Sequence, residues 1–186
     1  MGRRPVGRRP DIKTAVEEHV ILVNEADIPV GTMEKIEAHR KALLHRAFSV
    51  FIFDSQGRML LQRRAQGKYH SPGLWTNACC SHPRPDEDTG AAAMRRLREE
   101  LGFTTELTEL FAFTYRSEYD NGLTEFEYDH VFVGQYDAAI HPDPAEVSAY
   151  EYRDMEEIRA ELQADPARFT TWFHLAFPLV SEKYKG

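Results

Sequence analysis

The segment 86–103 constrains the fold more than any other part of the chain. The stretch Asp86-Glu87-Asp88-Thr89 supplies capping and first-turn residues for a helix, and Gly102 suits the left-handed position that follows a helix. Between them, residues 90–101 mix Ala and Leu with Arg and Glu, as in a helix that packs one face on a core. A solvated helix face would explain the Arg and Glu residues, but not the Gly-Phe ending. The segment therefore predicts a helix over 90–101.

Predicted strands lie on both sides of this helix. The turn Asp54-Ser55-Gln56-Gly57 predicts a hairpin between strands 46–53 and 58–64. Further predicted strands cover 19–23, 30–33, 109–116, 124–136 and 147–152. Further helices cover 155–163 and 169–183, and residues 34–44 form either a short helix or an irregular arm. Strands around one central helix, with helices at the C-terminal end, predict an α+β fold.

The length of the chain fits one globular domain. With 186 residues, of which 42% are apolar, we expect residues 19–186 to bury a single core. Residues 1–18 form a leader whose first ten positions hold four arginines and no acid. This composition predicts a disordered basic tail, with a transit peptide as the alternative.

Charge and composition exclude several classes of partner. The net charge of −7, from 23 basic and 30 acidic side chains, argues against nucleic acid as the main partner. No apolar run approaches the roughly 18 residues that cross a bilayer, so we expect no membrane insertion. Adjacent cysteines form a strained disulfide, which favours free thiols in a reducing compartment such as the cytoplasm.

Both cysteines stand side by side in the stretch 76–83, Thr-Asn-Ala-Cys-Cys-Ser-His-Pro. A turn with one buried thiol is one interpretation of this stretch. A metal or redox sensor is a second interpretation, because His82 follows Cys80 by two residues. The stretch alone leaves both open.

A set of histidines and glutamates could bind a divalent metal. Glu125 and Glu127 stand two apart on a predicted strand, so both carboxylates point to the same face. With His39, His45 and His82 they would form a mixed nitrogen and oxygen set suited to Mn²⁺, Mg²⁺, Fe²⁺ or Zn²⁺. The alternative is ordinary histidines and the solvent face of an amphipathic strand.

The central helix segment resembles the Nudix box, a loop-helix-loop motif that presents glutamates to a divalent metal on a diphosphate substrate. Glu99, Glu100 and Gly102 match the box, whereas Ser81 stands at its first glycine and Arg96 at one of its glutamates. Loss of that glutamate removes part of the metal cluster that would activate water for phosphate cleavage. A Nudix hydrolase acting on a nucleoside or prenyl diphosphate is therefore an alternative function.

From about His19 to the last helix, the chain is similar to the type I isopentenyl-diphosphate delta-isomerases. The resemblance is carried by His39 and His45, by the segment 72–83 and by Glu125-Phe126-Glu127-Tyr128, in this order. It implies a Nudix-like α/β/α sandwich with N-terminal and C-terminal additions. It also implies an enzyme of isoprenoid biosynthesis that acts on a small prenyl diphosphate. We expect this enzyme to be a monomer.

The resemblance assigns roles to individual residues. It implies catalytic roles for Cys80, Glu127, Tyr115 and Trp172. It implies substrate contacts for Lys35, Arg64, Lys68, Ser81 and Arg96. It implies that His39, His45, His82, Glu125 and Glu127 bind one divalent ion, either Mn²⁺, Mg²⁺ or Zn²⁺, and that Glu100 reaches a Mg²⁺ on the diphosphate.

The implied reaction moves a double bond between isopentenyl and dimethylallyl diphosphate. A proton is added at C4 and another is removed at C2, through a tertiary carbocation. We expect Glu127 with Tyr115 on the acid side and Cys80 as the base, with each group reversing its role in the reverse direction. A cationic centre would favour the Cys80 thiolate, and the Trp172 ring would shield the carbocation from water.

Overall fold

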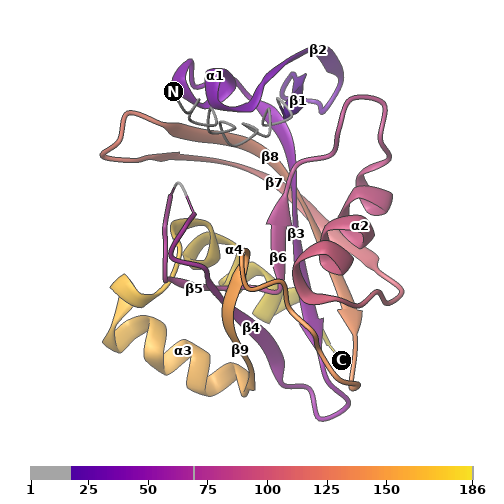
Figure 1. The fold of residues 1–186 in the computed structure, drawn as a ribbon, viewed down its shortest axis with the longest axis vertical. Helices are drawn as coiled ribbons and strands as arrows, with labels where there is room; N and C mark the ends of the chain where they lie inside the picture. The colour runs from indigo at the N-terminus through magenta and orange to yellow at the C-terminus, as the bar shows by residue number, and fades with distance from the viewer. Residues whose placement is uncertain (1–17, 69, 186) are drawn as a thin grey trace, which may run out of the picture.

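The computed structural model describes residues 18–68 and 70–185, which form a mixed sheet with helices on both faces (Figure 1). The predicted basic leader lies outside the described residues, except for Glu18. The strands are β1 (His19–Val23), β2 (Pro29–Glu34), β3 (His45–Phe53), β4 (Met59–Arg64), β5 (Trp75–Thr76), β6 (Cys79–Ser81), β7 (Thr108–Glu118), β8 (Thr124–Gln135) and β9 (Val147–Arg153). The helices are α1 (Lys35–Arg40), α2 (Thr89–Leu101), α3 (Met155–Ala164), the 3₁₀ turn η1 (Pro166–Arg168) and α4 (Thr171–Lys183).

Strand β3 lies at the centre of the sheet. One of its edges pairs in parallel with β8 over its whole length, from His45 beside Glu127 to Phe53 beside Gln135. Its other edge is shared by three strands in turn: β1 at His45, β6 around Ser49 and β4 at Phe53. This arrangement brings segments that are far apart in the sequence next to one another.

The predicted hairpin between 46–53 and 58–64 is present only at its turn. β3 and β4 pair at a single position, Phe53 with Met59. Because β6 occupies the next stretch of that β3 edge, β4 leaves it and pairs antiparallel with β9 and with β5. The turn was therefore predicted correctly, but the extended pairing was wrong.

Helix α2 begins and ends as its sequence predicts. The Asp88 side chain accepts a hydrogen bond from the Ala91 backbone N–H at 2.9 Å. Gly102 has a φ of 77°, and a Cβ atom at this position would lie 2.4 Å from the carbonyl oxygen of His141. A larger residue would be strained there, so the glycine fixes the end of the helix.

The sheet separates two apolar cores, in agreement with the expected α+β class. Phe48, Val50 and Ile52 of β3 pack with α2 on one face, whereas Phe51 and Phe53 pack with α3 and α4 on the other. Figure 1 shows α2 on one side of β3 and the two C-terminal helices on the other side. The alternation follows from the two-residue period of a strand, and it explains the uninterrupted apolar run of β3.

Candidate active site

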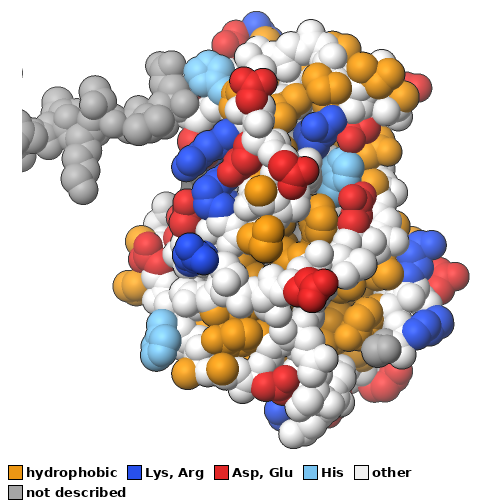
Figure 2. Space-filling model, turned by 90° about the vertical axis from the view of Figure 1, so that its right-hand side faces the viewer, with side chains coloured by type: hydrophobic (Ala, Val, Ile, Leu, Met, Phe, Trp, Pro, Cys, Tyr) orange, Lys and Arg blue, Asp and Glu red, His pale blue; other side chains and the backbone are white. Residues whose placement is uncertain are grey.

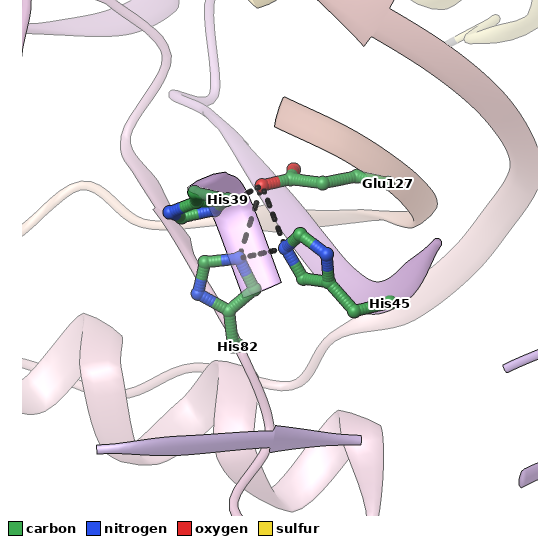
Figure 3. Close-up of side chains that lie close together, drawn as sticks. All are labelled: His39, His45, His82 and Glu127. Carbon is green, nitrogen blue, oxygen red and sulfur yellow. Dashed lines mark hydrogen bonds and ion pairs between the residues drawn. The ribbon is translucent and has the colours of Figure 1, made fainter. Parts of the chain in front are cut away.

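Four side chains from four separate segments converge at one point. His39 comes from α1, His45 from the start of β3, His82 from the residue after β6 and Glu127 from β8. One ligand atom from each lies within 4.8 Å of all the others. Figure 3 shows the three imidazole rings turned toward the Glu127 carboxylate.

The distances within this group fit a metal ion. The Nε2 atoms of His45 and His82 lie 3.2 Å apart, and Glu127 Oε1 lies 3.0 Å from His82 Nε2 and 3.5 Å from His45 Nε2. With metal bonds of about 2.1 Å, neighbouring ligand atoms lie about 3.0 Å apart in an octahedral site and about 3.4 Å apart in a tetrahedral one. The donor set therefore fits a divalent cation that accepts nitrogen and oxygen ligands.

Hydrogen bonding and burial prepare the imidazoles to act as ligands. His45 Nδ1 lies 2.8 Å from the Leu43 carbonyl oxygen, so Nδ1 carries the proton and Nε2 presents a lone pair. Within the described part of the chain, the buried Nε2 atom of His39 has no hydrogen-bond partner. Burial lowers the pKa of His82 to about 4, which keeps this ring neutral near pH 7.

Glu125 lies beside the four-residue group and not within it. Its Oε2 atom accepts hydrogen bonds from the hydroxyls of Tyr119, at 2.6 Å, and Tyr115, at 3.1 Å. The Tyr115 hydroxyl also lies 2.7 Å from Glu127 Oε2 and so joins the two carboxyl groups. Burial and the neighbouring Glu127 charge raise the pKa of Glu125 to about 8. The structure thus brings together four of the five expected ligands and holds the fifth next to them.

Cys80 lies on β6, directly beside Ser49 of β3. Its Sγ atom lies 3.2 Å from Asn77 Oδ1 and 3.4 Å from Ser49 Oγ. Burial, reinforced by the nearby Asp129 carboxyl group, raises the pKa of the Cys80 thiol well above its ordinary value. These surroundings favour the thiol, which is opposite to the direction we expected from the sequence. Cys79 points into the α2 core and is fully buried there.

Most of the predicted site residues line one cavity. Its wall contains the predicted residues Lys35, Arg64, Lys68, Cys80, Ser81, His82, Arg96, Tyr115, Glu125, Glu127 and Trp172, together with Glu18, His70 and Glu146. His39, His45 and Glu100 are buried behind this wall. The cavity is therefore lined by a thiol, carboxyl groups and imidazoles, together with four cationic side chains.

Each of these cations contacts an acidic or aromatic group. Lys35 pairs with Glu18, and Lys68 pairs with Glu146. The Arg64 guanidinium lies 5.2 Å from the centre of the Trp172 ring. These contacts hold the side chains near the cavity without removing their charge.

Arg96 is surrounded by carboxylates. It donates hydrogen bonds to Glu99 at 2.8 Å and to Glu100 at 2.6 Å, and it lies 3.5 Å from Glu146. Glu100 also accepts a hydrogen bond from Gln62 at 3.0 Å. The arginine that replaces a glutamate of the Nudix box therefore lies in the cavity wall, where three carboxylates balance its charge.

Sequence reasoning missed four residues of the cavity region, Glu18, His70, Tyr119 and Glu146. His70 lies edge-on to Trp172, with ring centres 5.6 Å apart, and its Nε2 atom lies 3.5 Å from Glu125 Oε1. Glu146 and Tyr119 also contact residues that had been predicted. The basic loop that contains Lys68 could have indicated His70, whereas no local pattern marks Glu146.

The face of the molecule around α2 carries side chains of both charges. On the face in Figure 2, where α2 lies, acidic and basic side chains are interspersed, as on an ordinary solvated surface. Among residues 18–68 and 70–185, no helix combines the length and apolar character needed to cross a membrane.

Comparisons with solved structures support the fold. DR0079 from Deinococcus radiodurans has a TM-score of 0.72 at 24% identity, covering 90% of this chain and all of that one. A MutT protein from Methanosarcina mazei has a TM-score of 0.62 at 20% identity, covering 77% and 96% of the two chains. At these identities the likeness concerns the fold alone.

Sequence comparisons define the family. The NUDIX domain family matches residues 43–173. The isopentenyl-diphosphate Delta-isomerase of Burkholderia multivorans is 50% identical over 159 residues, which cover 86% of this chain and 90% of that protein. The protein of the same name from Pectobacterium atrosepticum is 50% identical over 167 residues, covering 90% and 93%. The resemblance predicted from the sequence is confirmed: the chain belongs to the NUDIX domain family and, within it, to the isopentenyl-diphosphate delta-isomerases.

Proposed function

We propose that this protein interconverts isopentenyl diphosphate and dimethylallyl diphosphate, as the names of its relatives indicate for them. The observation that carries the proposal is that Cys80 and Glu127 line one cavity together with Lys35, Lys68 and Arg96. A cavity that combines groups able to exchange protons with several cations suits a substrate that carries both an alkene and a diphosphate.

Cys80 and Glu127 exchange protons with the substrate. In one direction a proton is added at C4, and the C2–H bond breaks so that its electron pair forms the C2=C3 double bond. The proton leaving C2 passes to one of the two residues, and the other residue supplies the proton at C4. Each residue donates in one direction and accepts in the other, and the Tyr115 hydroxyl, hydrogen-bonded to Glu127, relays the proton on that side.

Trp172 stabilises the carbocation, and the metal ligands and basic residues hold the charged groups of the site. The buried Trp172 ring stabilises positive charge through its π face and excludes water. His39, His45, His82 and Glu127, with Glu125 beside them, would hold one divalent ion, either Mn²⁺, Mg²⁺ or Zn²⁺. Glu100 would reach a Mg²⁺ that neutralises diphosphate charge. Lys35, Arg64, Lys68 and Arg96, with the Ser81 backbone, hold the diphosphate.

Two further assignments complete the proposal. We assign the enzyme to the cytoplasm, because both cysteines are free thiols, as in a reducing compartment. We also expect the enzyme to act as a monomer.

Phosphorus NMR tests this function against the hydrolase alternative. The enzyme is incubated with isopentenyl diphosphate, Mg²⁺ and Mn²⁺, with a chelator-treated sample as the control. An isomerase yields dimethylallyl diphosphate with both phosphorus atoms retained. Release of inorganic phosphate or diphosphate without isomerisation would refute the proposal.

A further inference from the structure

A buried carboxyl group next to the site has no role in the chemistry described so far. Asp129 follows Glu127 by two residues on β8 and is 1% exposed. Its Oδ2 atom accepts a hydrogen bond from Ser49 Oγ at 2.8 Å. Its Oδ1 atom has no hydrogen-bond partner among the described residues. Burial of such a group costs free energy, so a well-packed apolar residue here would stabilise the fold more.

Ser49 connects Asp129 to the reactive sulfur. It lies on β3 between β8 and β6, and it is paired directly with Cys80. Its single hydroxyl hydrogen points to Asp129, so a lone pair of Oγ faces Cys80 Sγ, 3.4 Å away. Ala47, which stands beside Asp129 in the β3–β8 register, is small enough to leave room for this diagonal contact.

Asn77, the second side chain in contact with the Cys80 sulfur, is also held in one orientation. The Asn77 side-chain nitrogen donates to the carbonyl oxygens of Val50, at 3.0 Å, and Cys79, at 2.9 Å. Its Oδ1 atom must therefore point the other way, toward Cys80 Sγ at 3.2 Å. The Cys80 sulfur thus contacts two oxygen atoms, Ser49 Oγ and Asn77 Oδ1. Other hydrogen bonds made by these two side chains fix the orientation of each oxygen.

We propose that Ser49 and Asp129 form a positioning pair that holds the Cys80 sulfur in the orientation for proton exchange with the substrate. Asp129 fixes the Ser49 hydroxyl. The single thiol hydrogen is donated to Asn77 Oδ1, and the fixed Ser49 Oγ atom, 3.4 Å from Sγ, holds the position of the sulfur. Neither Ser49 nor Asp129 lines the cavity, so the pair acts through Cys80 and not on the substrate. This inference rests on the proposed isomerase function.

Three variants test the pair. Ser49→Ala removes the link, Asp129→Ala removes its anchor, and Asp129→Asn keeps an oxygen that can accept the Ser49 hydrogen bond. We expect the two alanine variants to lower kcat roughly tenfold with little change in KM, because one hydrogen bond is lost on the Cys80 side. Asp129→Asn should retain most of the activity. Ser181→Ala on α4, which removes a hydroxyl that accepts a hydrogen bond from Arg159 of α3, is the control.

Hydrogen exchange in D₂O separates positioning from a general loss of structure. Glu127 can add a proton to one carbon of the alkene and then remove a proton from the same carbon. This carbon therefore exchanges its hydrogen with solvent without the help of Cys80. Ser49→Ala should therefore change the ratio of deuterium incorporation at C2 and C4. Exchange at the carbon that reacts with Cys80 should slow by roughly tenfold. Metal content should match that of the wild type.

The possible outcomes are distinct. Equal slowing at both carbons, or wild-type kinetics in both alanine variants, would overturn the positioning role. A loss in Asp129→Asn as large as that in Asp129→Ala would also overturn it. If Ser49→Ala does not fold, the two Asp129 variants decide the question by the same exchange ratio. Absence of exchange in the wild type would instead refute the isomerase proposal itself.

Discussion

One face of the sheet has a polar half, which lies at the candidate site, and an apolar half, which packs in the core. On β8, the residues that point to the α4 side are Glu125, Glu127 and Asp129 in the first half, followed by Val131 and Val133. All five are less than a tenth exposed. The same strand therefore places buried carboxyl groups in the site and apolar side chains in the core.

Strand β3 repeats this division beside it. His45 and Ser49 lie next to the site, whereas Phe51 and Phe53 pack with the C-terminal helices. Because β3 and β8 run parallel and in register, their polar halves lie side by side, as do their apolar halves. The register thus creates the site and the core in one step.

The two halves contribute to stability in opposite ways. A fully buried apolar side chain contributes about 1.5 to 3 kcal/mol relative to an exposed one. A buried ionisable group without complete pairing costs free energy. The apolar half therefore holds the fold together, and the polar half is retained for its chemistry. Substitutions in the two halves should consequently change different measured quantities.

The largest effect is expected at Glu127, which is assigned both to the metal and to proton exchange. Glu127→Gln should lower kcat by about 10² to 10⁴-fold and also reduce the bound metal. Steady-state kinetics and elemental analysis of the purified protein measure the two effects. Glu156→Gln, an exposed change on α3, is the control. Unchanged metal content in Glu127→Gln would remove this residue from the ligand set.

Cys80→Ala should separate the two roles. We expect turnover to fall by about 10² to 10⁴-fold, while metal content and thermal stability stay close to those of the wild type. The neighbouring Cys79→Ala is the matched control, since this side chain packs in the α2 core and should affect stability more than turnover. Retained turnover in Cys80→Ala would show that the thiol takes no part in proton exchange.

The apolar half should respond in stability alone. Phe53 is fully buried, and its ring stacks on Tyr184 with centres 3.9 Å apart. Phe53→Ala should lower the free energy of unfolding by about 3 to 5 kcal/mol, while the kcat of the folded fraction is retained. Denaturant unfolding and active-site-normalised kinetics measure these quantities. A catalytic loss without destabilisation would contradict the division between the halves.

A smaller effect should appear in the pH dependence of the metal-free protein. Burial lowers the pKa of His82 from 6.5 to about 4. The unfolded chain therefore binds more protons between these two pH values, and His82 makes the protein less stable as the pH falls through this window, by up to about 3 kcal/mol. Thermal melts of the wild type and His82→Asn measure the difference. Identical pH profiles would show that His82 is not held neutral.

Sequence reasoning succeeded where the signal is local. The Asp88 cap and Gly102 fix the ends of α2. The sequence predicted a cap within residues 86–89 and predicted Gly102 as the residue that ends the helix. The pairing of β3 with β6 and β8 was not predicted. These partners lie some 30 to 80 residues farther along the chain, and no tight turn connects them to β3. The contact between Ser49 and Asp129 depends on that pairing, so it could not be predicted either.

The candidate site shows the same limit. His39, His45, His82 and Glu127 were named from their spacing and the family resemblance, and the structure brings their ligand atoms together. His70 and Glu146 were identified only from the residues that line the cavity, because their place in the site depends on where their loops lie. The sequence thus indicated the chemistry, and the structure added the residues that surround it.

Position-specific deuterium labelling tests the central claim most directly. The wild-type enzyme is incubated with isopentenyl diphosphate and divalent metal in D₂O, and the carbon chain and the phosphorus atoms are followed by NMR. If the polar half exchanges protons through Cys80 and Glu127, deuterium enters at both C2 and C4 while the diphosphate remains intact. An unlabelled carbon chain together with released phosphate would contradict the account.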